Sequence, residues 1–267
     1  MAKSCKFYKQ QRQVSYDNGV TWIPLDEYQK GALIEVNSSD CTSPSPKIYR
    51  WAQTEDTICV FDGKFMAKYN NGQTYEIPCD GNPTLTSGDT HPQGYDYSAM
   101  TEAYIGSCVT SIGQYAFSDC TGLTSVTIPN SVTSISGSAF LNCISLTSVT
   151  IPNTVTSIGG SAFWNCSSLV SVNIPNDLAR IEMNTFYLCR SLVSVTIPSS
   201  VTFIGNSAFY NCINLQSVTC LRITPPSTQL AFFEGSTCPI YVPSQSVNAY
   251  KTTDYWWIYA DRIQAIP

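Results

Sequence analysis

The sequence contains little charge, a single histidine and no long apolar run. Of its 267 residues, 12% are Asp, Glu, Lys or Arg. Between residues 109 and 219 the charged residues are Asp119, Asp177, Arg180, Glu182 and Arg190. Phosphate binding requires a clustered basic face, so the sequence disfavours a nucleic-acid partner. No segment approaches the roughly 20 consecutive apolar residues of a membrane span, so no membrane-spanning helix is predicted.

Residue patterns for catalysis and for metal or cofactor binding are also missing. The one histidine, His91, lies between Thr90 and Pro92 without a nucleophile or carboxylate at a recognisable spacing, so we interpret it as a surface loop residue. Zinc, calcium, phosphate-loop and dinucleotide motifs are absent. A glycosidase needs two carboxylates that flank the bond, but we expect Asp177 and Glu182 to pair with Arg180 or to face solvent. The sequence therefore predicts no enzyme, no metal and no cofactor.

A 23-residue unit recurs through the second half of the chain. Leu-x-x-Val-x-Ile-Pro repeats with a proline after Ile128, Ile151, Ile174 and Ile197, and cysteines recur at the same interval at Cys120, Cys143, Cys166, Cys189 and Cys212. A fixed period of this length indicates stacked repeats, each burying its apolar face against its neighbours. The spacing of two around Val126 and Ile128 predicts a strand, which proline ends. We predict a mainly β solenoid with Leu, Val, Ile, Phe and Cys inside.

Twelve cysteines would ordinarily suggest a disulfide framework. The five in the repeat are better explained as small buried thiols that fill a tight corner. Four others, Cys5, Cys41, Cys59 and Cys79, lie outside this ladder and could form disulfides, whose pairing the sequence leaves open.

The repeat Leu-x-x-Val-x-Ile-Pro-x-x-Val-x-x-Ile-x-x-x-Ala-Phe-x-x-Cys resembles the bacterial BspA-like leucine-rich repeat over residues 105–220. Residues 221–267 resemble the C-terminal cap of that family in gut Bacteroidetes. Ile240 to Pro243 imitate a last rung, and a short helix after Ser244 is expected to lay apolar side chains over the open edge: Tyr250, Trp256, Trp257 and Ile258. An exposed edge would otherwise promote aggregation. The resemblance implies attachment to a cell surface and adhesion to host matrix or to other microbes.

The first hundred residues differ from the repeats. Residues 15–22 match the Asp-box pattern Ser-x-Asp-x-Gly-x-Thr-Trp, and residues 68–75 are a degraded copy; Asn-Gly in both predicts hairpins. We predict small β-hairpin modules over residues 1–80, divided near residue 42, and a turn-rich linker over 81–104. These modules resemble parts of proteins of Bacteroides and their phages, where they would anchor the chain to a larger virion or envelope assembly.

Two surfaces of the solenoid are candidates for binding. The first is formed by outward-pointing residues of the strands: Ser125, Thr127, Ser148, Thr150, Ser171, Asn173, Ser194 and Thr196. They suit the ordered hydroxyls of a polysaccharide, or alternatively satisfy one another between rungs. The second follows the phenylalanine of each rung, at Leu141, Trp164, Tyr187 and Tyr210. These side chains suit sugar rings or protein partners, or alternatively pack on each other and shield the cysteine corner.

Two functions from different classes are compatible with these patterns. The first is a non-enzymatic recognition protein on a bacterial cell surface, which binds a glycan or protein through its solenoid. Residues 1–9 lack the apolar core of a signal peptide, so this function requires a leader missing from the chain. The alternative is a phage virion component, a fibre or decoration protein, which needs no leader. A purely structural spacer is a third interpretation.

Overall fold

The computed structural model describes residues 13–14, 23–24, 63–230 and 232–267. The chain divides into two compact units, Met1–Asp62 and Gly63–Pro267. In the first unit, β1 (Gln13–Val14) pairs antiparallel with β2 (Ile23–Pro24). The Asp-box segment between these strands lies outside the described residues, and so do Cys5, Cys41 and Cys59.

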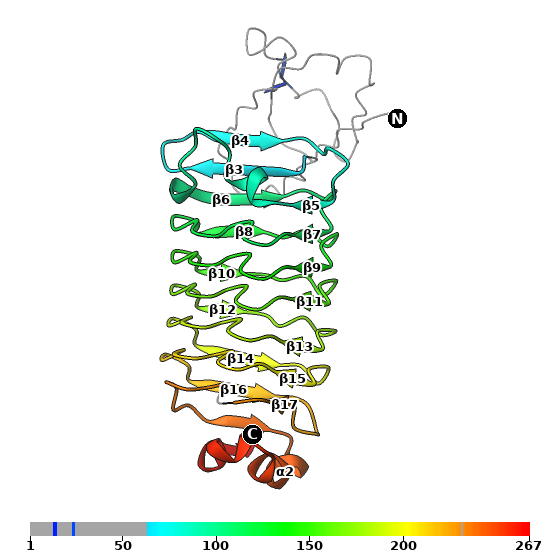
Figure 1. The fold of residues 1–267 in the computed structure, drawn as a ribbon, viewed down its shortest axis with the longest axis vertical. Helices are drawn as coiled ribbons and strands as arrows, with labels where there is room; N and C mark the ends of the chain where they lie inside the picture. Colours follow the sequence, from blue (N-terminus) through cyan, green and yellow to red (C-terminus); the bar gives the residue numbers. More distant parts are fainter. Residues whose placement is uncertain (1–12, 15–22, 25–62, 231) are drawn as a thin grey trace. The chain divides into compact units, whose positions relative to one another are not determined.

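The second unit consists of short strands and a few helical turns (Figure 1). Its strands are β3 (Phe65–Tyr69), β4 (Thr74–Ile77), β5 (Thr84–Leu85), β6 (Met100–Ile105), β7 (Ser111–Ile112), β8 (Ser125–Thr127), β9 (Ser134–Ile135), β10 (Ser148–Val149), β11 (Ser157–Ile158), β12 (Ser171–Val172), β13 (Arg180–Ile181), β14 (Ser194–Ile197), β15 (Phe203–Ile204), β16 (Ser217–Cys220), β17 (Ser227–Thr228), β18 (Ile240–Val242) and β19 (Ile263–Ala265). Its helices are α1 (Ser87–Thr90) and α2 (Val247–Thr252), and its 3₁₀ helices are η2 (Tyr97–Ala99), η3 (Ser244–Ser246) and η4 (Trp256–Arg262).

Each repeat forms one rung with a strand on each of two faces, and equivalent strands of successive rungs pair in parallel. Ser125 lies opposite Ser148, and Ser148 opposite Ser171, at the 23-residue interval. The first face consists of the sheets β12-β10-β8-β6-β3-β4 and β14-β16-β18-β19. The second consists of β11-β9-β7-β5 and β13-β15-β17. The predicted mainly β solenoid is thereby confirmed, because 23 residues return the chain to the same place in the next rung.

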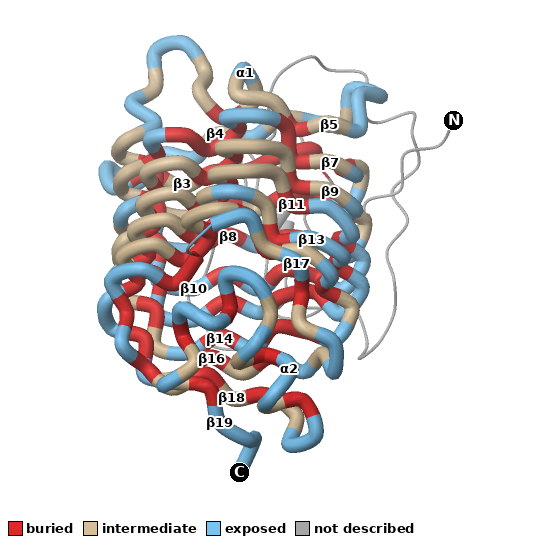
Figure 2. The backbone as a smooth tube through the Cα atoms, turned by 60° about the horizontal axis from the view of Figure 1, so that its bottom comes forward, coloured by how far each residue is buried: buried red, intermediate tan, exposed pale blue. Residues whose placement is uncertain are grey.

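The interior is filled by the residues that define the repeat (Figure 2). Leu146, Val149 and Ile151 of one rung are at most 4% exposed, and their counterparts in the other rungs are buried as well. The phenylalanines stack in a column with ring centroids 5.0–5.5 Å apart, formed by Phe117, Phe140, Phe163, Phe186, Phe209 and Phe233. We call this the phenylalanine column.

The third side of each rung, which we call the turn side, runs from the second strand back to the next first strand. In the five turns between residues 113 and 216, two residues have positive φ: the first set is Tyr115, Ser138, Ser161, Asn184 and Ser207, and the second is Asp119, Asn142, Asn165, Leu188 and Asn211. Asn and Asp tolerate this left-handed backbone better than other L-residues, which accounts for most of the second set. Their side chains also join rungs: Asn142 Nδ2 donates to Asp119 Oδ1 (2.8 Å), and Asn165 Nδ2 to Asn142 Oδ1 (3.0 Å).

The solenoid begins earlier than the sequence predicts. Residues 81–104, expected to be a linker, contain β5 and β6, which pair in parallel with β7 and β8 as an ordinary rung does. The linker prediction is wrong, and the solenoid's compact unit starts at Gly63 rather than after residue 80. The hairpin predicted over residues 68–75 is confirmed as β3–β4, with Gly72 at φ 80° in its turn. Because β3 pairs antiparallel with β6, this hairpin covers the edge of the first rung.

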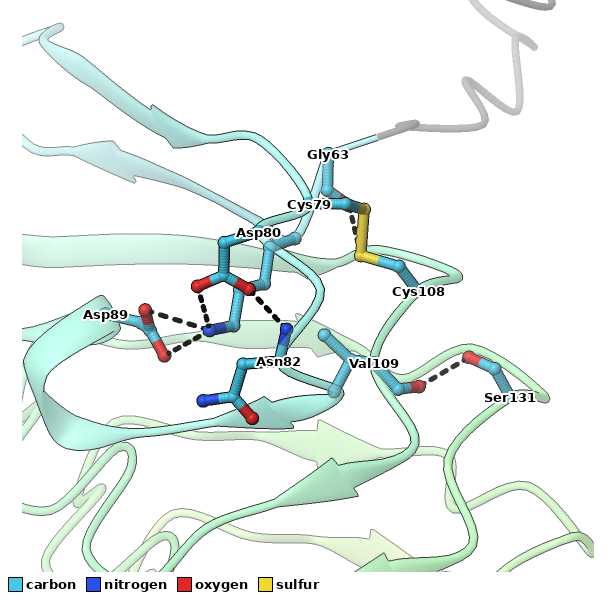
Figure 3. The surroundings of a disulfide bond; sticks show 9 residues. Gly63, Cys79, Asp80, Asn82, Asp89, Cys108, Val109 and Ser131 are labelled. Atoms are coloured by element: carbon cyan, nitrogen blue, oxygen red, sulfur yellow. Dashed lines mark hydrogen bonds and ion pairs between the residues drawn. A yellow bond between two sulfur atoms is a disulfide. The ribbon is translucent and has the colours of Figure 1, made fainter. Parts of the chain in front are cut away.

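A disulfide and a buried ion-pair cluster hold this N-terminal cap together (Figure 3). Cys79, after β4, is bonded to Cys108, after β6. The side chain of Lys64 is 1% exposed, and its Nζ lies 3.0 Å from a carboxylate oxygen of both Asp80 and Asp89. Burial alone lowers the pKa of Lys64, but the hydrogen bonds and charges of these two carboxylates raise it above its usual value. The cap therefore keeps a buried charge fully paired.

His91 belongs to the first rung and is not the surface loop residue that the sequence suggests. Its Nε2 lies 3.5 Å from Cys120 Sγ, at the end of the cysteine ladder, and its ring centroid lies 4.2 Å from that of Tyr97. Burial lowers the pKa of the imidazole. His91 thus packs as a half-buried neighbour of the ladder.

The C-terminal cap follows the prediction in part. β18 continues the first face, and η3 and α2 follow it. Tyr250 and Trp256 are fully buried, and the Trp256 indole N–H donates to the Pro226 carbonyl (2.8 Å). Trp257 and Ile258 are 60% and 46% exposed, so their predicted place over the edge is wrong. They lie in a 3₁₀ helix, whose period of three residues returns Tyr259, not its neighbours, to the core.

Candidate recognition surfaces

The predicted strand-face residues do lie together on the first face, where we call them the hydroxyl face. They are all exposed: Ser125, Thr127, Ser148, Thr150, Ser171, Asn173, Ser194 and Thr196. These residues form two columns along the solenoid, one of each pair per rung. The strand pairing continues both columns toward the N-terminal cap and one of them toward the C-terminal cap. Glu102 and Tyr104 stand opposite Ser125 and Thr127, and Tyr241 stands opposite Thr219. The result is a flat polar surface whose side chains repeat at about 4.8 Å.

One member of the hydroxyl face has a structural role. Asn173 Oδ1 accepts from the Ile151 N–H (2.8 Å), and Asn173 Nδ2 donates to the Ile151 carbonyl (2.6 Å). The side chain therefore bridges two rungs close to the place where the first-face sheet is interrupted between β12 and β14. Thr124, which precedes Ser125, also joins two rungs, since its Oγ1 donates to the Thr101 carbonyl (2.9 Å).

A charged cluster that the sequence analysis missed stands at the N-terminal end of this face. Lys68 Nζ lies 2.8 Å from Glu102 Oε2, and the Tyr104 hydroxyl donates to the same oxygen at 2.5 Å. Burial raises the pKa of Glu102, but the hydrogen bonds from Lys68 and Tyr104 outweigh it and lower that pKa overall. Polar and apolar side chains alternate around Ala103, which is a strand signal. That signal could have placed Glu102 and Tyr104 on the hydroxyl face.

The second candidate surface is a continuous stack on the turn side. Trp164 and Tyr187 have ring centroids 4.5 Å apart at 36°, and Tyr187 and Tyr210 have centroids 4.8 Å apart at 8°. All three side chains are half-buried. We call these three residues the aromatic ridge. Leu141, one rung earlier, is half-buried too, whereas Ser118 is 8% exposed and donates to Asp119 Oδ2 (2.8 Å).

Backbone hydrogen bonds identify one further member of this column. The Asn142 N–H donates to the Trp164 carbonyl, and the Asn211 N–H donates to the Glu234 carbonyl in the same way (2.8 and 2.7 Å). Glu234 therefore occupies the ridge position of the last rung and is exposed. It falls outside the 23-residue pattern because 24 residues, not 23, separate it from Tyr210.

The cysteines beneath this side are buried thiols, as predicted. Cys143, Cys166, Cys189 and Cys212 each donate a sulfur hydrogen bond of 3.1–3.3 Å to a phenylalanine carbonyl of the preceding rung. Burial raises the pKa of both Cys120 and Cys212 to about 12. Thiols that stay protonated are poor nucleophiles, so this column contributes packing rather than chemistry.

One carboxylate of the repeats, Glu182, has the partner that the sequence suggests. Glu182 accepts a hydrogen bond from Arg180 Nε at 2.6 Å, as expected, and the Arg180 guanidinium lies 3.9 Å from the centroid of the Phe203 ring. The part of the chain that the structure describes holds no group of three or more His, Cys, Asp or Glu side chains placed to bind a metal ion. Within the same residues, no helix has the length and apolarity required to span a membrane.

Known proteins resemble the chain in this architecture. Residues 91–222 match the family model "BspA type Leucine rich repeat region" in 6 copies. A leucine-rich repeat protein of T. pallidum is 24% identical, with a TM-score of 0.50, and the match covers 71% of this chain and 84% of that one. For proteins of Eubacterium ventriosum and Bacteroides ovatus, identities are 24% and 23% and TM-scores 0.48 and 0.44. Those matches cover 64% and 67% of this chain, and 50% and 56% of the two relatives. The search of curated proteins finds no match.

Residues 91–222 are therefore a leucine-rich repeat region of the BspA type. The match starts at residue 91, before the 105 that the sequence pattern predicts, in agreement with the additional rung formed by β5 and β6.

Proposed function

We propose that this protein is a non-enzymatic recognition protein, displayed outside a cell, whose solenoid binds a glycan or protein on another surface. The observation that carries the proposal is the aromatic ridge. Trp164, Tyr187 and Tyr210 occupy a position that the fold also fills with Ser118 and Glu234. Since the rung does not require a ring there, three stacked rings that stay half-exposed are best explained by a ligand.

The hydroxyl face supports the same function, because it is flat, exposed and nearly free of charge. A rigid stack of rungs offers the long surface that repeat proteins use for binding. The first unit, residues 1–62, is the candidate for attachment to an envelope or a larger assembly. Residues 63–80, which the sequence analysis included in that anchor, belong to the solenoid.

The Cys79–Cys108 disulfide favours the adhesin over the virion component. Disulfides form and persist in oxidising environments such as the cell exterior and the periplasm, whereas thiols in the cytosol, where virions assemble, are kept reduced. A bacterial surface protein crosses into such an environment before it reaches its ligand.

Binding of the labelled chain to gut bacterial cells, to host mucus and to extracellular matrix tests the proposal. An adhesin is expected to bind mucus or matrix, while binding to bacteria alone would favour a phage receptor-binding role. Absence of binding to all three would refute the recognition function and leave a structural spacer.

A further inference from the structure

Both faces of Tyr187, the central ring of the aromatic ridge, are covered by its two ring neighbours. Tyr187 lies between Trp164 at 4.5 Å and Tyr210 at 4.8 Å, and the two tyrosine rings are nearly parallel. A sugar ring binds an aromatic side chain by lying on its face, so Tyr187 offers no such platform. Between the two end rings, the ridge presents ring edges to a partner, which carry the positive part of the aromatic quadrupole, together with two phenol hydroxyls. Ring edges and hydroxyls suit carbonyl oxygens and apolar side chains.

The residues beside the ridge have the composition of a protein interface. Ile144 and Ile213, three positions after Leu141 and Tyr210, are 39% and 55% exposed, and Met183 is 54% exposed. Aromatic residues, Met and Arg are enriched in protein interfaces, and Trp, Tyr and Arg dominate their binding energy. This side of the solenoid thus differs from the hydroxyl face, whose side chains are small and polar.

Two charges of opposite sign flank the ridge. Arg190, three positions after Tyr187, and Glu234, at the end of the column, are both exposed. Neither takes part in the four ion pairs found among the described residues. They lie two rungs apart, about 10 Å along the solenoid at strand-like spacing. A partner can therefore gain from an acidic group opposite Arg190 and a basic group opposite Glu234.

We propose that the aromatic ridge docks a polypeptide of another protein, through apolar side chains bordered by one acidic and one basic residue. This inference rests on the proposed recognition function and specifies the ligand class for the turn side. A glycan would be expected on the hydroxyl face instead, where no rings stack.

The test uses the full chain and two defined probe sets. Short random peptides on a display library are selected for binding to the wild-type protein, and soluble hexasaccharides of cellulose, chitin and xylan are titrated in parallel. Each binder is then measured against Trp164→Ser/Tyr187→Ser/Tyr210→Ser. Serine is used because Ser118 occupies the same position in an earlier rung. Phe163→Ala is the matched control, since it destabilises the same rung and leaves the ridge residues in place.

Selected peptides are expected to lose at least about tenfold in affinity for the triple variant, which corresponds to 1.4 kcal/mol, and to keep their affinity for Phe163→Ala. Arg190→Glu should weaken the peptides that contain an acidic residue, and Glu234→Lys those that contain a basic one. Peptides that bind the triple variant equally well, or a hexasaccharide that depends on the ridge, would overturn the proposal. Binding of mucus or cells that survives in the triple variant would refute the peptide site while leaving the recognition function intact.

Discussion

Two aromatic columns run side by side along the turn side, and they differ in what the fold requires of them. The phenylalanine column has the same residue in each rung from Phe117 to Phe233, and its members are at most 1% exposed. The neighbouring column changes from Ser118 through Leu141, Trp164, Tyr187 and Tyr210 to Glu234. Both columns stack at about one strand spacing.

The difference shows how a repeat separates folding from recognition. A buried position is restricted to a side chain that fills the interior at crystal-like density, so each rung repeats the phenylalanine. The position beside it is less restricted, since serine, leucine, tryptophan, tyrosine and glutamate occupy it in different rungs. The residue type at this position can therefore be selected for ligand binding. Four predictions test this contrast between the two columns.

The largest expected effect is the difference between two adjacent residues, Phe163 and Trp164. Phe163→Ala should lower the free energy of unfolding by about 3–5 kcal/mol, because it leaves a cavity in the column. Trp164→Ala should cost about 1–2 kcal/mol, since that side chain is only partly removed from water. Urea unfolding of both variants measures the difference. Equal losses of unfolding free energy would mean that the column of the aromatic ridge is as important for stability as the phenylalanine column.

Loss of the Cys79–Cys108 disulfide tests how the N-terminal end of the phenylalanine column is covered. Phe65 of β3 packs edge-on against Phe117, with centroids 5.7 Å apart, and the disulfide tethers the hairpin that contains it. Cys79→Ala/Cys108→Ala should lower the free energy of unfolding by about 3–4 kcal/mol, the loop-entropy value for a cross-link of this span. A reductant should destabilise the wild-type protein but not this variant. An unchanged wild-type protein under reduction would contradict the prediction.

A smaller effect is expected at a glycine where the backbones of two rungs lie close together. A Cβ on Gly205 would lie 2.4 Å from the Met183 nitrogen, whereas a Cβ on Gly137 would meet only the Gly160 carbonyl at 3.2 Å. Gly205→Ala should cost about 2–3 kcal/mol, as overpacking does, and Gly137→Ala less than about 1 kcal/mol. Thermal unfolding of the two variants provides the comparison. If Gly137→Ala proved the more damaging, the close approach of these rungs would not be the cause.

Leu188 offers a gain in stability next to the ridge. It has φ 61° at a position where Asn142, Asn165 and Asn211 stand in other rungs. Leu188→Asn should raise the free energy of unfolding by about 1 kcal/mol, because asparagine tolerates the left-handed backbone and can extend the amide ladder. A rise in the urea midpoint would support this explanation of the ladder, and a fall would show that the leucine side chain packs more favourably than the strain costs.

The sequence predicted most of the solenoid because its core residues recur at a fixed interval, and each recurrence repeats the same packing. Its errors fall where that interval is interrupted. The first rung replaces the Ala-Phe turn with α1 and was taken for a linker. Glu234 was missed because an additional residue shifts the last rung. Trp257 and Ile258 were misplaced because the cap follows a 3₁₀ period. Cys108 was not considered as a partner of Cys79, since disulfide pairing depends on spatial rather than sequence proximity.

For the candidate surfaces, the sequence predicted which residues share a side but not how they are oriented. Column membership follows from the 23-residue interval alone. That Trp164, Tyr187 and Tyr210 pack on each other was one of the two alternatives that the sequence left open, and the choice depends on their rotamers. The use of Asn173 as a bridge depends on a local interruption of the sheet. Neither property leaves a periodic signal in the sequence.

The most direct test of the central claim compares binding and stability in one set of variants. Wild type, Trp164→Ser/Tyr187→Ser/Tyr210→Ser, Ser148→Ala/Ser171→Ala/Ser194→Ala and Phe163→Ala are assayed for binding to mucus and bacterial cells and for their unfolding midpoints. The account predicts that the ridge variant loses binding at least about tenfold, while Phe163→Ala binds normally despite its lower stability. A ridge variant that is folded and binds as well as the wild type would contradict the account.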